Sequence, residues 1–226
     1  SHYHLSALPV VLPWLWRSFR ASTPRRVLHS ARGALPLIER SLAEHEALIA
    51  QAGRPDLLRR TGWIKLFRSQ ASLEAGVAEL ERAREFAGIA GEVMDAAAIA
   101  AREPNFSGDF AGAIHWPAPG FVPDPGLLAK TYADLFVRNG GRFFAGDART
   151  LEQDGRLWRL RAAGGEAIVA GAAVVALGPW SDLVFRPLGY AIPLGVKRGY
   201  HGHYAPRGNA VLHHPVLDAD RGFLLA

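Results

Sequence analysis

The sequence predicts a mixed α/β (α+β) fold, in which helices alternate with both antiparallel and parallel strands. Apolar residues recur at helical spacing between Pro24 and Gly53, and again after Pro125. Residues 61–68 alternate with period two, which is typical of a half-buried strand. The run 172–177 is apolar throughout, as expected of a strand buried on both faces of a parallel sheet. These patterns together favour one mixed chain over separate all-helical and all-strand domains.

The composition is that of a folded protein. The chain has 226 residues, of which 49% are hydrophobic and 21% charged, enough for one large or two small domains. It contains no cysteine, which excludes disulfides, thiolate metal sites and cysteine nucleophiles. The net charge is +5, carried mostly by arginines that are dispersed along the sequence. A nucleic-acid binder more often clusters such residues, so we predict no nucleic-acid partner.

Residues 10–19 form a short apolar stretch rich in aromatic side chains. We expect a surface helix or loop packed on a neighbouring element. A sharper interpretation is a peripheral membrane contact through Trp14 and Trp16 beside Arg17 and Arg20. No apolar run reaches the roughly 18 residues that cross a bilayer, and the first residues lack the basic region of a signal peptide. We therefore expect a cytoplasmic protein, peripheral to the inner membrane at most.

Helix boundaries are marked by capping residues. Ser22-Thr23-Pro24 begins a helix that Gly53 ends, and Pro36 should kink or split it. Three further starts are predicted, with their helices: Ser69 (to about Phe86), Asp95 (to about Pro104) and Asp124-Pro125 (to Asn139).

The remaining segments predict strands. Strands are expected at 61–68, 92–94 and 113–116, in an antiparallel meander of 142–153, 156–162 and 166–169, and at 172–177, 192–204, 210–214 and 222–225. Asp154-Gly155 and Gly164-Gly165 are the hairpin turns of the meander. Gly178 to Ser181 turns into a short helix.

Standard catalytic and metal motifs are absent from the sequence. There is no GxSxG, HExxH or Walker loop. In the strand expected here, the adjacent His213 and His214 would point to opposite faces, so we expect them not to share one ion. His201 and His203 point the same way but lack a third ligand. We predict no metal site.

The turn at Gly178 is the strongest local signal for a ligand. A buried strand that ends in a glycine turn and opens a helix can present backbone N–H groups to a phosphate. Glycine also lets a ligand approach the backbone closely. On these grounds alone the signal for a nucleotide is weak.

The segment around this turn resembles the D-amino-acid oxidase and dehydrogenase superfamily of FAD enzymes. The shared pattern consists of Ala176, Gly178, Trp180 and Ser181, then Ile192-Pro193-Leu194, then Lys197-Arg198-Gly199-Tyr200-His201. The Asp124-Pro125 helix start, Gly140-Gly141 and the meander also match. The RGYH ending is closer to the bacterial D-amino-acid dehydrogenases than to the oxidases.

The resemblance implies an incomplete FAD-binding Rossmann-like domain interleaved with an antiparallel-sheet substrate domain. The implied division is 1–123 (mainly helical and substrate-domain), 124–183 (FAD-binding, with the meander) and 184–226 (substrate-domain strands). The chain has no GxGxxG, and it stops where the family's flavin-covering segment begins. We therefore expect a central fragment that does not hold FAD tightly by itself.

The resemblance also implies a reaction and its residues. FAD would take a hydride from a D-amino acid, and the acceptor of the electrons, a quinone or another molecule, stays open. The implied flavin contacts are Ala148 at the adenine, and Ala176, Gly178 and Trp180 at the ribose and pyrophosphate. The implied substrate contacts are Arg198, Tyr200 and His201, with His203 behind them; an ordinary role in the sheet stays open for each. No catalytic acid or base is implied.

Two alternatives remain at this stage. One is a glycine- or sarcosine-type amine oxidase, which uses oxygen as electron acceptor. The other is a non-catalytic substrate-domain fragment, which the absent GxGxxG favours.

Overall fold

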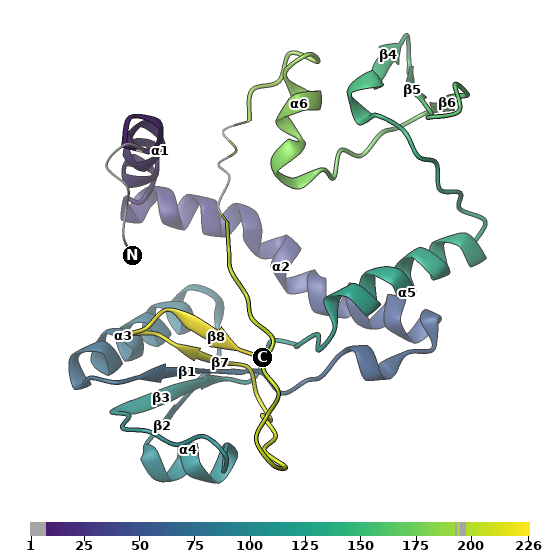
Figure 1. Cartoon of the computed structure of the whole chain (residues 1–226). Helices are drawn as coiled ribbons and strands as arrows, with labels where there is room; N and C mark the ends of the chain where they lie inside the picture. The colour runs from purple at the N-terminus through teal and green to yellow at the C-terminus, as the bar shows by residue number, and fades with distance from the viewer. Residues whose placement is uncertain (1–7, 193, 195–197) are drawn as a thin grey trace. The chain divides into compact units, whose positions relative to one another are not determined.

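The computed structural model describes residues 8–192, 194 and 198–226 (Figure 1). The chain forms two compact units, each built from two separate stretches of sequence. Unit 1 comprises Ser1–Gly33 and Asn139–Gly202, and unit 2 comprises Ala34–Arg138 and His203–Ala226. Compactness does not test which segments bind flavin or substrate, so the domain division implied by the sequence stays a prediction.

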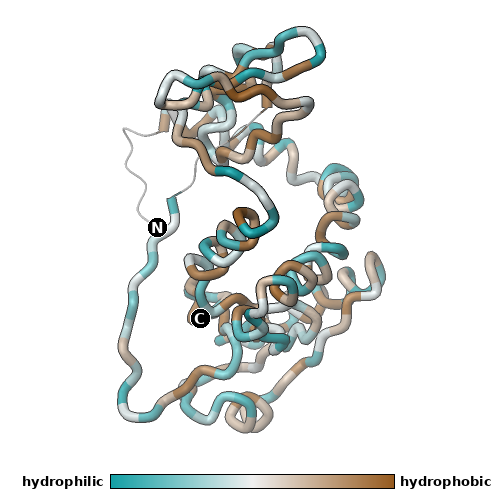
Figure 2. Tube along the Cα trace, turned by 90° about the vertical axis from the view of Figure 1, so that its right-hand side faces the viewer, coloured by the Kyte–Doolittle hydropathy of each residue, from teal (hydrophilic) through white to brown (hydrophobic). Residues whose placement is uncertain are grey.

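Helices and strands alternate along the chain, and the predicted mixed α/β class is confirmed. The helices are α1 (Leu8–Ala21), α2 (Pro24–Ala52), α3 (Gln70–Ala87), α4 (Ala96–Arg102), α5 (Pro125–Arg138) and α6 (Asp182–Phe185), with 3-10 turns η2 (Pro55–Leu57), η3 (Ala148–Thr150) and η4 (Gly178–Trp180). The strands are β1 (Trp63–Phe67), β2 (Glu92–Met94), β3 (Gly112–Trp116), β4 (Glu152–Asp154), β5 (Leu157–Arg161), β6 (Ala167–Ala170), β7 (Val216–Asp218) and β8 (Phe223–Leu225). Along the helices the trace alternates between hydrophobic and hydrophilic residues (Figure 2).

The predicted caps position the helices. The Ser69 hydroxyl accepts the N–H of Ser72, and the Ser72 hydroxyl closes a capping box, so α3 begins where predicted. Gly88 ends α3 with φ +64°, a left-handed conformation that suits glycine. Asp95 accepts the N–H of Ala98 at the start of α4. α2 continues through Pro36 as one helix, so a split at this proline is wrong.

Unit 2 is organised by a five-stranded sheet in the order β2-β3-β1-β7-β8. The pair β1–β7 is parallel, and the other pairs are antiparallel. Alternate residues of β1 enter different cores because successive side chains point to opposite faces. Ile64 and Leu66 pack with α4, whereas Phe67 packs with α3. The sheet is therefore covered by one helix on each face.

A third apolar cluster joins α2 to α5 within unit 2. Ile49, Leu57 and Leu128 are its buried residues. Beside it, Nδ1 of His45 lies 2.7 Å from the hydroxyl of Tyr132, and the two rings stack. Burial raises the pKa of Tyr132. His45 is thus a helix-face histidine with a structural partner.

Unit 1 contains a three-stranded antiparallel meander in the order β4-β5-β6. Gly155 and Gly165, with φ of +63° and +84°, occupy the left-handed positions that the predicted hairpin turns require. The sequence predicted that the first meander strand would begin at residue 142, but residues 142–146 do not form a strand. Their only described pairing is a single bridge from Gly146 to Ala162.

Three predicted strands are absent from the described residues. The run 172–177 has no regular structure, and Val174 is 92% exposed, because no described strand pairs with it. Residues 198–204 are also irregular, and Pro193 and Lys197 of the quoted motifs lie outside the described residues. Residues 210–214 form no ladder because the N–H groups of His213 and His214 bond to a side chain instead. The strand starts later, as β7.

Candidate functional site

The turn at Gly178 has the conformation and the openness that close ligand approach requires. Its φ is +55°, in the region that glycine adopts without strain. A Cβ at this position would have no heavy atom within 4 Å. Trp180, at the end of the same turn, is 67% exposed. The backbone of this turn is therefore open on its glycine side.

Two of the elements that carry predicted flavin contacts meet at α6. This helix contacts η3, which begins with Ala148, and η4, which carries Gly178 and Trp180. Ala176 is not part of this group, because it lies in the exposed run before η4. At the first residue of α6, Oδ1 of Asp182 is buried and has no partner among the described residues. Such an oxygen calls for a hydrogen-bond donor.

The charge beside Ala148 is fixed by a local ion pair. Asp147 accepts hydrogen bonds from the Arg149 guanidinium and from the Arg149 N–H. The side-chain bond first, and then the backbone bond, lower the pKa of Asp147 to about 2. The carboxylate is therefore ionised at physiological pH. Because Arg149 balances this charge, the pair leaves no net charge beside Ala148.

The predicted substrate contacts lie in an irregular, exposed segment. Arg198, Tyr200 and His201 are all exposed, and Tyr200 is 89% exposed. The strand that should orient them is absent from the described residues. Their role in substrate binding stays a prediction.

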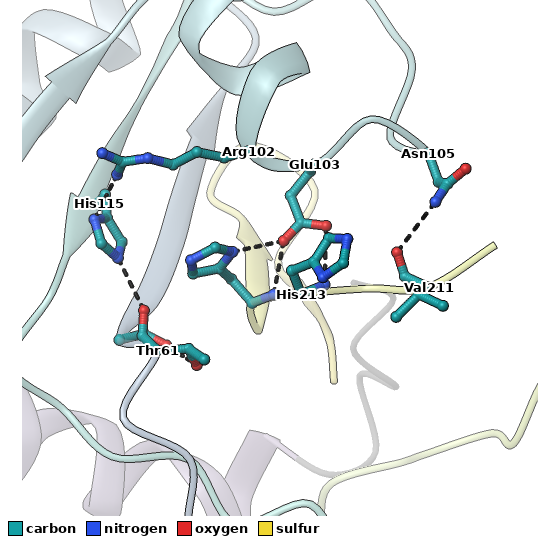
Figure 3. A network of polar contacts seen from close by, with 9 residues as sticks. Thr61, Arg102, Glu103, Asn105, His115, Val211 and His213 are labelled. Atoms are coloured by element: carbon teal, nitrogen blue, oxygen red, sulfur yellow. Dashed lines mark hydrogen bonds and ion pairs between the residues drawn. The ribbon is translucent and has the colours of Figure 1, made fainter.

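A buried carboxylate in unit 2 escaped the sequence analysis. Glu103 follows α4 and is 1% exposed. It accepts the backbone N–H groups of His213 (3.0 Å) and His214 (2.6 Å), and Nδ1 of His214 lies 2.7 Å from the same carboxylate (Figure 3). The carboxylate thus fastens the segment before β7 to the end of α4. An acidic residue before a proline gives no sign of burial in the sequence.

A second histidine completes this polar network. The ring of His115, on β3, packs edge-on against the ring of His214, with the ring centroids 5.3 Å apart. The Arg102 guanidinium donates to Nδ1 of His115 at 2.6 Å, so Nε2 carries the proton and donates to the carbonyl of Thr61 at 3.0 Å (Figure 3). Arg102 also pairs with Glu92 at 2.6 Å. Both ring nitrogens of His115 are therefore engaged, one with the end of α4 and the other with the carbonyl of Thr61 before β1.

Unit 2 also has an apolar pocket of about 310 Å³, next to this polar network. It is lined by Gly62, Trp63, Pro119, Gly120, Phe121, Pro215, Leu217 and Leu224. Thr61 and His214 of the polar network directly precede Gly62 and Pro215 in the chain. The pocket can receive an apolar group, but none of its lining side chains is ionisable.

The chain matches the FAD dependent oxidoreductase family (DAO) over residues 12–225, nearly its whole length. The chain belongs to this family. Its members depend on FAD, so the cofactor predicted from the sequence is that of the family. The resemblance seen in the Gly178 and RGYH motifs is confirmed.

Curated relatives of this FAD-dependent family include amino-acid dehydrogenases and oxidases. A D-amino acid dehydrogenase of Xylella fastidiosa (strain M12) is 32% identical over 212 residues, 92% of this chain and 46% of that protein. A D-amino-acid oxidase of Bradyrhizobium diazoefficiens is 29% identical over 204 residues, 87% of this chain and 46% of that protein. The chain spans about half the length of the curated relatives it matches.

Solved structures of similar fold include a glycine oxidase and an L-proline dehydrogenase. Glycine oxidase from Geobacillus kaustophilus has a TM-score of 0.57 at 23% identity, covering 75% of this chain and 44% of that one. L-proline dehydrogenase from P. horikoshii has a TM-score of 0.59 at 14% identity, covering 80% of this chain and 49% of that one. At these identities the similarity shows the fold alone.

The described residues fit a dinucleotide at part of its length. The open glycine turn at Gly178 allows a phosphate close to the backbone, and the unpaired Asp182 oxygen matches a hydroxyl donor. The charge-balanced pair of Asp147 and Arg149 leaves no net charge at the neighbouring Ala148, which is compatible with a neutral base.

Proposed function

We propose that the whole protein oxidises D-amino acids and passes the electrons through FAD to an acceptor. The observation that supports this most is the 32% identity to a D-amino acid dehydrogenase over 92% of the chain. The RGYH motif, which is closer to bacterial D-amino-acid dehydrogenases, agrees with it.

In this proposal the protein contributes binding and orientation. Bound FAD would supply the redox chemistry by accepting a hydride from the α-carbon of the substrate. The amino acid loses two electrons and two protons in total, and water hydrolyses the resulting imino acid to a 2-oxo acid and ammonia. No acid–base pair of this chain is needed for that step, which agrees with the absence of a catalytic motif.

The FAD contacts proposed for this chain are mainly backbone contacts. Gly178 would approach the pyrophosphate, with Ala176 and Trp180 beside it, and Ala148 would lie by the adenine. The open space at Gly178 and the joint packing of η3 and η4 on α6 support this assignment.

The substrate carboxylate is proposed to pair with Arg198. A guanidinium presents a planar pair of donors that matches a carboxylate. Tyr200 and His201 would bound the same site from the following positions. The exposure of Arg198 and Tyr200 leaves them accessible to a ligand.

The visible spectrum of the purified whole protein, with added FAD, tests the proposal. We expect the absorbance of oxidised flavin to be bleached by D-alanine without oxygen, and not by L-alanine, glycine or sarcosine. Bleaching by glycine or sarcosine alone would instead identify an amine oxidase of the glycine oxidase type. A colourless protein that FAD cannot restore would favour a non-catalytic fragment. Recovery of the colour with oxygen or only with a quinone separates oxidase from dehydrogenase.

The Arg198→Gln variant tests the carboxylate contact. Loss of a charge-assisted hydrogen bond should raise KM about 10- to 100-fold. Arg207→Gln is the matched control, because Arg207 is also an exposed arginine of the neighbouring segment. An equal effect of both substitutions would contradict a specific role for Arg198.

A further inference from the structure

Four apolar side chains line one exposed face of α1. Leu12, Leu15, Trp16 and Phe19 stand at positions i, i+3, i+4 and i+7, which share one side of a helix. They are 54%, 39%, 61% and 71% exposed. The rings of Trp16 and Phe19 stack on each other, with centroids 6.1 Å apart. A contiguous apolar stripe of this kind on a surface marks an interaction site.

The positive charge of the protein is concentrated in the same region. Five of the 26 Lys and Arg residues lie within residues 1–38, which contain no Asp or Glu. The remaining 21 are balanced by the 21 acidic residues that follow. Although the arginines are dispersed, the whole net charge of +5 therefore arises from this segment.

A hollow of about 470 Å³ lies where α1 meets α2, at one end of the apolar stripe. Its lining consists of Phe19, Arg20, Ser22, Thr23 and Arg26. One guanidinium nitrogen of Arg26 donates to the carbonyl of Arg20 at 2.9 Å, which holds the turn between the helices closed. The guanidinium groups of Arg20 and Arg26 and the hydroxyl of Thr23 thus border a space next to the apolar stripe, whereas the Ser22 hydroxyl donates to the carbonyl of Ser18. This is the donor set that binds a phosphate.

We propose that α1 and the first turns of α2 form a docking surface for the anionic face of a lipid bilayer. The stripe of α1 would enter the boundary between headgroups and acyl chains, with Trp16 at the interface. Arg17, Arg20, Arg25 and Arg26 would lie among the headgroups. None of the described helices is long and apolar enough to cross a bilayer.

The combination of features favours lipid over other partners. A single-stranded nucleic acid would use the arginines and stack bases on Trp16 and Phe19, but it gains nothing from the aliphatic Leu12 and Leu15 of the same stripe. A second protein would use the stripe but would need its own excess of acidic residues. An anionic bilayer supplies both the apolar layer and the negative charge.

Co-sedimentation with vesicles tests the proposal. The protein is mixed with vesicles of phosphatidylcholine alone or with a third phosphatidylglycerol. We expect binding to the anionic vesicles only, and its loss at high salt, because exposed charges are screened there.

Two double variants separate the two contributions. Arg20→Gln with Arg26→Gln should weaken binding by about 25-fold, because each arginine near an anionic surface contributes roughly fivefold. Trp16→Ser with Phe19→Ser should weaken binding at every salt concentration. Arg82→Gln with Arg84→Gln is the matched control, since these exposed arginines of α3 lie in the other unit and carry the same charge. Circular dichroism checks that each variant keeps its helices.

Several results would overturn the proposal. Equal binding to neutral and anionic vesicles would remove the role of the arginines. No binding to either vesicle would assign the stripe to a protein partner. A dimer in light scattering that Trp16→Ser with Phe19→Ser dissociates would assign it to a second copy. Retention of the protein by single-stranded DNA without vesicle binding would indicate a nucleic-acid surface.

Discussion

The sheet of unit 2 and the run 172–177 of unit 1 contain similar residues and differ in their neighbours. In β1, Ile64 and Leu66 are 1% and 0% exposed, with strands on both sides and a helix on each face. Val174, in an equally apolar run, is 92% exposed and has no strand beside it among the described residues. An apolar run therefore specifies a strand only when the chain provides partners for its N–H and C=O groups.

Buried polar groups are not equally satisfied. In unit 2 the carboxylate of Glu103 is surrounded by donors. Among the described residues, Oδ1 of Asp182 in unit 1 and Nε1 of Trp116 in unit 2 are buried without a partner. Four predictions sharpen this comparison.

The largest effect is expected for Glu103→Ala. The change leaves two backbone N–H groups and His214 without their acceptor in a buried place, at a cost of about 4 kcal/mol. Urea unfolding measures it. The control is Glu92→Ala, whose side chain is 54% exposed in a surface ion pair, with an expected cost under about 1 kcal/mol. Similar losses in both variants would show that burial of Glu103 contributes little.

The direct contrast between the regions is Leu66→Ala against Val174→Ala. The first leaves a cavity between packed elements and should cost about 3 kcal/mol. The second removes two exposed methyl groups and should change the free energy of unfolding by less than about 0.5 kcal/mol. A cost above about 2 kcal/mol for Val174→Ala would mean that this run is packed after all.

Asp218 should make the free energy of unfolding of unit 2 decrease as the pH falls into the acid range. Burial on its own would raise the pKa of Asp218, but hydrogen bonds from the Arg221 N–H and the Arg68 guanidinium lower it overall. The stabilisation is therefore complete above the unfolded pKa of about 4 and is lost as the pH falls through the lower native pKa. Asp218→Asn should cost about 2 kcal/mol at neutral pH and flatten this part of the pH profile. Urea unfolding curves recorded between pH 7 and 2 test this prediction. If Asp218→Asn leaves the fall of the free energy of unfolding at acid pH unchanged, Asp218 is not its cause.

The smallest effect is expected for Ser69→Ala. The hydroxyl satisfies the N–H of Ser72 at the start of α3, and its loss should cost about 1 kcal/mol. Ser69→Asp, which keeps a capping acceptor, is the control and should restore most of the stability. Thermal unfolding followed by circular dichroism is the measurement, and failure of the aspartate to restore stability would argue against capping as the cause.

Local signals in the sequence were sufficient for most elements of unit 2. The caps at Ser69, Asp95 and Asp124 fix where three helices begin, because each supplies an acceptor within the same few residues. The alternation around Ile64 gave β1 within two residues. By contrast, the bounds of β7 were not predicted. Its three residues are too few to show an alternating pattern, and the hydrogen bond from the N–H of His214 to Glu103 keeps the preceding residues out of the strand.

In the candidate site, too, features set by local backbone preferences were predictable, and features that depend on distant segments were not. The left-handed turn at Gly178 and the short helix after it were predictable, since glycine and proline restrict the backbone locally. The burial of Glu103 was not, because it depends on the segment 213–214, more than a hundred residues away. The strand expected to carry Arg198 and Tyr200 needed neighbours that the sequence of that strand does not specify.

The sequence by itself determined the caps, the turns, the mixed class and the family, since these rest on short-range backbone preferences and on motifs read directly. Only the tertiary structure decided which apolar runs become strands, which carboxylates are buried, and that α1 leaves its aromatic stripe on the surface. The physical reason is that hydrogen-bond pairing and exclusion from water depend on distant segments, whereas turns and caps are satisfied within a few residues.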